Sequence, residues 1–129
     1  MESTIFILGR ILLGGFFAYS GFNHFKGIGM MSGYAQMKGV PLPKPFVALT
    51  GALLLVGGLS ILLGIYPTVG VAALALFLVP VTYKMHAFWK LQDPMARMGE
   101  KVNFTKNVAL LGAALSLLAI PQPWTVSLF

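Results

Sequence analysis

The chain has 129 residues, of which 57% are hydrophobic and only 9% are charged. A soluble domain carries roughly 25% charged residues and must cover a large surface with polar groups. This composition excludes an ordinary soluble domain and predicts a protein surrounded by lipid. The net charge of +6 does not indicate nucleic-acid binding, because the basic residues gather in two connecting segments rather than over one water-facing surface.

The sequence contains no cysteine. This absence excludes disulfides, thiolate zinc sites and iron–sulfur ligation within the chain. A secretory signal peptide has a basic region before its apolar run. Here Glu2 precedes the first apolar run and Lys26 follows it, so we expect this run to be retained as a membrane span.

Four apolar runs are each long enough to cross a bilayer core of about 30 Å as a helix. No segment alternates with the period of two that a membrane β-strand requires. The sequence therefore predicts an all-α integral membrane four-helix bundle forming a single domain over residues 1–129. The expected spans are residues 4–25, 46–64, 68–89 and 104–120.

The connections between these spans differ in charge. The first contains three lysines and no acid, the second contains no charged residue, and the third contains four basic residues against Asp93 and Glu100. Cytoplasmic loops are enriched in Lys and Arg. We therefore expect the first and third connections in the cytoplasm and both termini on the non-cytoplasmic side of a bacterial or archaeal inner membrane.

Two further features concern packing. Residues 30–38 have the mixed character of a short interfacial helix that ends at Gly39. Small residues recur at helical spacing, with Gly14 and Ala18 in the first span and Gly112 and Ser116 in the last. Small residues allow close helix contact in lipid, so a tightly packed bundle explains them without a ligand. The small size of the bundle leaves homodimerisation open.

Arg10 lies about two turns inside the first span, where an ionisable side chain is costly. One interpretation is that Arg10 extends to the outer membrane surface. The other is that it faces the bundle interior and binds a carbonyl, a phosphate or a quinone oxygen. Gly14, Phe17, Gly21 and His24 share its helical face, which favours the interior.

A second polar group is expected at the inner ends of the first and third spans, which reach the same depth. It comprises Asn23, His24, Tyr83, His86 and Trp89. Interfacial histidines and an aromatic belt explain these residues without a ligand. The alternative is a site for an amphiphile, in which aromatic rings stack on its polar head and a histidine or the Tyr83 hydroxyl binds a carbonyl. Tyr83 and His86 stand three residues apart, which predicts one shared helix face.

Other chemistries have little support. A metal site would need carboxylates or thiolates in the spans, and bis-histidine haem ligation rests on two histidines alone. No nucleophile with a neighbouring base, glycine-rich phosphate loop or carboxylate pair occurs. Autonomous catalysis is therefore not expected.

The sequence resembles the DoxX family of small four-span membrane proteins. The matching stretches are Gly9–Gly14, Ser20–Phe22 with Lys26, Gly39–Pro41, Gly57–Gly64 and His86–Trp89. The family name comes from a subunit linked to thiosulfate oxidation with quinone as electron acceptor, and other members resemble partners in membrane redox complexes. By position, Arg10, Lys26 and His86 with Phe88-Trp89 fall on the family pattern.

Two functional hypotheses follow. The first, implied by the resemblance and the inner-end residues, is an accessory subunit of a quinone-linked membrane redox system, with quinone as the candidate ligand and other redox subunits as partners. The second is a non-catalytic scaffold, chaperone or cargo-binding protein that holds another membrane protein through its small-residue faces. A transporter is disfavoured because the four spans show no pair of broken helices.

Overall fold

The structure of this chain is a computed structural model that describes residues 2–125. It contains five α-helices and two short 3₁₀ helices, and no strand occurs in the part of the chain that it describes. The helices are α1 (Glu2–Lys26), α2 (Ile28–Met37), α3 (Pro43–Leu63), α4 (Pro67–Met85), η1 (Phe88–Lys90), α5 (Pro94–Ser116) and η2 (Leu117–Ala119).

Four segments are long and apolar enough to cross a membrane: Ser3–Lys26, Pro43–Leu63, Pro67–Lys90 and Pro94–Ala119. The expected all-α architecture with four spans is therefore confirmed. The short helix α2 lies between the first two of these segments, where residues 30–38 were expected to be helical.

Two helix ends differ from the expected spans. The last helix begins at Pro94 rather than near residue 104, because the Asp93 carboxylate accepts a hydrogen bond from the Ala96 N–H at 2.9 Å and caps it. The helix α4 ends at Met85, and His86 leaves the helical conformation with φ −117° and ψ 39°. The polar third connection is thus mostly helix.

Glycines bring α1 and α3 into backbone contact. A Cβ atom on Gly58 would lie 2.3 Å from the Ala18 amide nitrogen, and one on Gly14 would lie 2.8 Å from the Gly58 carbonyl oxygen. Gly21 approaches the Gly51 carbonyl oxygen in the same way. The small-residue face of α1 is therefore occupied within the fold, whereas a Cβ on Gly112 of α5 would have no described atom within 4 Å.

The turn between α3 and α4 is also closely packed. Gly64 ends α3 with φ 72°, a left-handed conformation that glycine adopts without steric cost. The Ser60 hydroxyl lies against the carbonyl oxygens of Ile65 and Tyr66, and Gly57 packs on Leu74. Buried side chains of α1, α3 and α4 complete the core: Phe17, Leu54, Ile61, Leu74 and Leu78.

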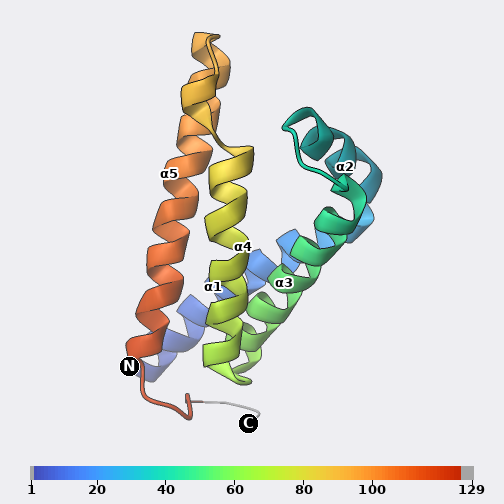
Figure 1. Ribbon diagram of the computed structural model, residues 1–129. Coiled ribbons are helices and arrows are strands. Elements are labelled where there is room, and N and C mark those ends of the chain that lie inside the picture. Colours follow the sequence, from blue (N-terminus) through green and yellow to red (C-terminus); the bar gives the residue numbers. More distant parts are fainter. Residues whose placement is uncertain (1, 126–129) are drawn as a thin grey trace.

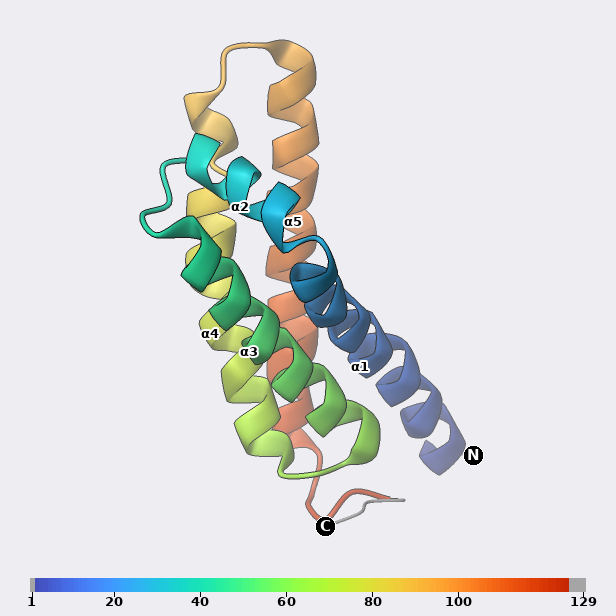
Figure 2. The same ribbon diagram turned by 90° about the vertical axis from the view of Figure 1, so that its right-hand side faces the viewer.

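The packed end of the bundle is the end that holds both chain termini. In Figure 1, α3 and α4 meet near the termini and diverge toward α2, while α5 runs along α4. Figure 2 shows α1 leading from the N-terminus up to α2, with both termini again at one end. The molecule therefore has a closed terminal end and an open end at α2.

This geometry predicts opposite effects for two glycine substitutions. Gly58→Ala should lower the free energy of unfolding by about 2–3 kcal/mol, because the new methyl group meets the backbone of α1. Gly112→Ala should be neutral or stabilise the helix by up to about 1 kcal/mol. Thermal unfolding of the two variants in one detergent compares them. Equal losses of stability would contradict the helix packing described here.

Candidate ligand site

A cavity of about 720 Å³ occupies the open end of the bundle, between the arm formed by α1, α2 and α3 and the arm formed by α4 and α5. Its walls are mainly apolar and aromatic: Phe16, Phe17, Leu53, Leu54, Phe77 and Val81 contribute to them. The volume lies in the range of pockets that hold small organic ligands. The polar side chains that line it are Ser20, Asn23, His24, Tyr34, Thr50, Lys84, His86, Lys106 and Asn107.

The ring of His24 is held in one orientation inside the cavity. Its Nδ1 lies 2.9 Å from the Ser20 carbonyl oxygen one helical turn earlier, and its ring packs edge-on against Phe77 of α4 at 6.0 Å between ring centres. Because a carbonyl oxygen can only accept, Nδ1 must carry the proton. In the neutral imidazole, Nε2 is therefore a hydrogen-bond acceptor.

His86 lines the cavity from the end of α4 and contacts the buried carboxylate of Glu100. The distance from His86 Nδ1 to Glu100 Oε2 is 3.2 Å. The same oxygen accepts a hydrogen bond from Lys38 Nζ at 3.0 Å, and Oε1 accepts one from Asn103 at 3.1 Å. Glu100 is only 8% exposed, so these three partners replace the water that an ionised carboxylate otherwise binds.

Lys38 connects the two arms of the bundle, because it follows α2 while Glu100 lies on α5. Burial opposes its charge, but the hydrogen bond and charge of Glu100, together with Tyr34, raise the pKa of Lys38 above its usual value. A raised pKa in the folded state stabilises the fold below the ordinary lysine pKa, and this contribution is lost only above it. The link therefore persists at neutral pH.

Asn107 is an incompletely bonded polar residue in the cavity wall. It is 8% exposed and lies on α5, yet its side-chain amide makes no hydrogen bond with any residue of the described range 2–125. A ligand that offers both a donor and an acceptor would satisfy it.

Tyr83 and Trp89 were predicted to belong to the site, but they lie outside the cavity. Tyr83 is 65% exposed, its ring packs against Trp89 at 5.7 Å, and neither residue lines the cavity. Trp89 also contacts Phe88 and Phe104, which join this aromatic cluster to α5. Tyr83 and His86 do not share a helix face, contrary to the expectation from their spacing, because α4 ends before His86.

Arg10 lies at the closed end, and it is 3% exposed. Its Nε donates to the Ile61 carbonyl at 3.0 Å and its Nη2 to the Leu62 carbonyl at 3.2 Å, while Nη1 donates to the Thr125 carbonyl. The Arg10 guanidinium also lies 5.4 Å from the Trp124 ring centre. Of the two interpretations of Arg10, the structure shows the inward one, in which its partners include backbone carbonyls at the end of α3.

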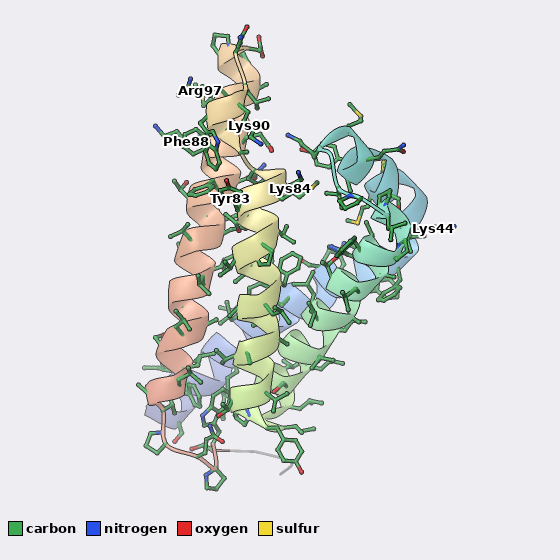
Figure 3. All side chains as sticks on the ribbon, in the orientation of Figure 1. Lys44, Tyr83, Lys84, Phe88, Lys90 and Arg97 are labelled. Atoms are coloured by element: carbon green, nitrogen blue, oxygen red, sulfur yellow. The ribbon has the colours of Figure 1, made fainter. Side chains whose placement is uncertain are left out.

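Several basic residues lie at the open end of the molecule (Figure 3), so its two ends differ in charge as well as in packing. Figure 3 shows Lys44, Lys84, Lys90 and Arg97 at the open end of the molecule, away from the termini, and Lys84 on α4 beside the gap that faces α2. A Cβ on Gly39 would lie 3.5 Å from Lys84 Nζ, so this lysine reaches the connection after α2. Among residues 2–125, no three His, Asp or Glu side chains are grouped to hold a metal ion.

Of the predicted site residues, the cavity brings together Asn23, His24 and His86. Sequence reasoning missed Lys38, Glu100 and Asn107. The last two had a detectable signal, because Glu100, Asn103 and Asn107 are spaced three and four residues apart and so follow one face of a helix. Lys38 had none, since its partner lies 62 residues away.

The fold, with four helices long and apolar enough to cross a membrane, defines a small helical integral membrane protein. The DoxX family model matches residues 5–87, which is more than half of the chain. The chain therefore belongs to the DoxX family. The search of curated proteins and the search of solved structures gave no significant match.

The contacts of Arg10 predict a structural role that a substitution can test. Arg10→Gln removes the charged fork that binds the end of α3 and should lower the free energy of unfolding by about 3 kcal/mol. Arg97→Gln, at an exposed position on α5, is the matched control and should change it by less than about 0.5 kcal/mol. Chemical unfolding in detergent measures both. Similar values for the two variants would refute this role.

Proposed function

We propose that this protein binds an amphiphilic ligand in the cavity and serves as an accessory subunit of a quinone-linked membrane redox system. The observation that carries the proposal is a mainly apolar cavity between the apolar helices, with several polar side chains in its wall. An amphiphile needs both surfaces, one for its chain and one for its head. Membership of the DoxX family supports the redox setting.

The hydrogen-bond donors in the cavity wall match the oxygen acceptors of a quinone ring. Lys84, Lys106 and the Asn107 amide line the cavity and can donate hydrogen bonds to ring oxygens. Phe16, Phe46 and Phe77 supply aromatic surface for a flat ring. The basic open end would face the cytoplasm under the positive-inside rule, so the head would lie near the cytoplasmic leaflet and the termini on the other side.

A tryptophan reporter inside the cavity tests the proposal, because quinones quench tryptophan emission on contact. Phe46 lines the cavity and is 43% exposed, whereas Phe22 is 57% exposed and lies outside it. Each is replaced by tryptophan in a Trp89→Phe background. A short-chain quinone analogue should quench the Phe46→Trp variant saturably.

The Phe22→Trp variant controls for quinone that is merely dissolved in the detergent micelle. It should show only a linear, non-saturating loss of emission. Native mass spectrometry from mild detergent provides a second measurement by detecting retained quinone or lipid. Indistinguishable quenching curves for the two reporters, with no retained ligand, would refute the proposal.

One observation favours the scaffold hypothesis. Helix α5 buries few of its side chains, and Gly112 has open space around it, so this face can accept a helix of another protein. Gly14 cannot serve this purpose because it contacts α3. The scaffold hypothesis is favoured if Gly112→Leu releases a co-purifying membrane protein and neither tryptophan reporter shows saturable quenching by the quinone.

A further inference from the structure

The two histidines of the cavity have the same hydrogen-bonding role. His24 Nδ1 donates to the Ser20 carbonyl, and His86 Nδ1 lies in hydrogen-bonding contact with the Glu100 carboxylate. A carbonyl oxygen has no proton to donate, and neither has the Glu100 carboxylate when it is ionised. The contact of Glu100 with Lys38 favours the ionised form. Each Nδ1 therefore carries the proton, and each neutral imidazole presents Nε2 as an acceptor.

Neither Nε2 atom has a hydrogen-bond partner among residues 2–125, and both histidines line the same cavity. The two rings lie at different depths. The His24 ring packs on Phe77, which precedes His86 by nine residues, or about two and a half helical turns. The cavity thus offers one acceptor deep in its wall and one near its open end.

The oxidised and reduced forms of a quinone differ in which hydrogen-bond donors and acceptors of the cavity they can pair with. A quinone oxygen only accepts, so it can bind Lys84, Lys106 or Asn107 but leaves both imidazole acceptors unpaired. A hydroxyl group donates and accepts at once. A ring with hydroxyl groups on opposite edges can therefore donate to the histidines and still accept from the lysines and the amide.

We propose that the cavity selects the reduced, dihydroxy form of an aromatic amphiphile, a hydroquinone, with His24 and His86 as its hydrogen-bond acceptors. This inference rests on the proposed binding of an amphiphile in the cavity. Glu100 is a positioning residue, because its carboxylate accepts from His86 Nδ1 and so fixes the tautomer of the neutral imidazole in which Nε2 is the acceptor. Asn107 adds a donor and an acceptor for the same polar head.

Titration calorimetry of the detergent-solubilised protein tests the preference. Under anaerobic conditions, a short-chain ubiquinone analogue and its hydroquinone are titrated separately into the wild-type protein. Because a bound quinone would leave both imidazole acceptors unpaired, the hydroquinone should bind roughly tenfold more tightly or better. This comparison needs no variant and so does not depend on the folding of one.

Substitutions then identify the acceptors. His24→Phe and His86→Phe keep an aromatic ring but remove the acceptor, so each should reduce the hydroquinone preference by roughly fivefold or more. His24→Gln restores an acceptor oxygen and should recover part of the preference. Tyr83→Phe removes a polar group outside the cavity and should leave the preference unchanged.

The outcomes separate the two proposals. Equal affinities for the two redox forms would overturn the hydroquinone preference while amphiphile binding stands. A preference that persists in the combined His24→Phe and His86→Phe variant would overturn the assignment of the acceptors. Binding of neither form, together with unsaturated quenching of the cavity reporter, would overturn the proposed function itself.

Discussion

The buried guanidinium of Arg10 secures one end of this bundle. The last carbonyls of a helix have no partner within the helix, and lipid supplies none. Arg10 binds two of these carbonyls at the end of α3 and a third in the C-terminal segment, so it joins three parts of the chain. Its positive charge also suits the negative end of the α3 dipole. An ionisable residue that would be costly in the membrane thus stabilises the fold.

The consequence is a bundle with two different ends. Glycines along α1 and α3 allow backbone contact between these two helices, and near the termini glycines also allow close packing between α3 and α4. At the α2 end the helices diverge, and a cavity lies between them. The ion pair of Lys38 with Glu100 connects the two arms across this end. Close packing at one end therefore coexists with a cavity at the other.

The overall architecture was predictable because span length, charge asymmetry and small-residue spacing are local properties of the sequence. The depth of Arg10 also indicated a buried role, although its backbone partners could not be inferred because they depend on where α3 ends. The inner-end site was only partly predictable. His24 and His86 line the cavity, but Tyr83 does not, and the spacing of three residues did not place it on the face of His86 because His86 lies beyond the end of α4 at Met85. Lys38 and Glu100 meet only through the tertiary fold, so spacing along the chain could not pair them.

The central claim is that the open end of the bundle holds an amphiphile. Cryo-electron microscopy of the protein in lipid nanodiscs, with an antibody fragment added for size and the hydroquinone analogue supplied, tests it most directly. The account predicts elongated density between α1, α3 and α4, with its head beside His24 and Asn107. Helices α3 and α4 packed together along their whole length, with no space between them, would contradict it.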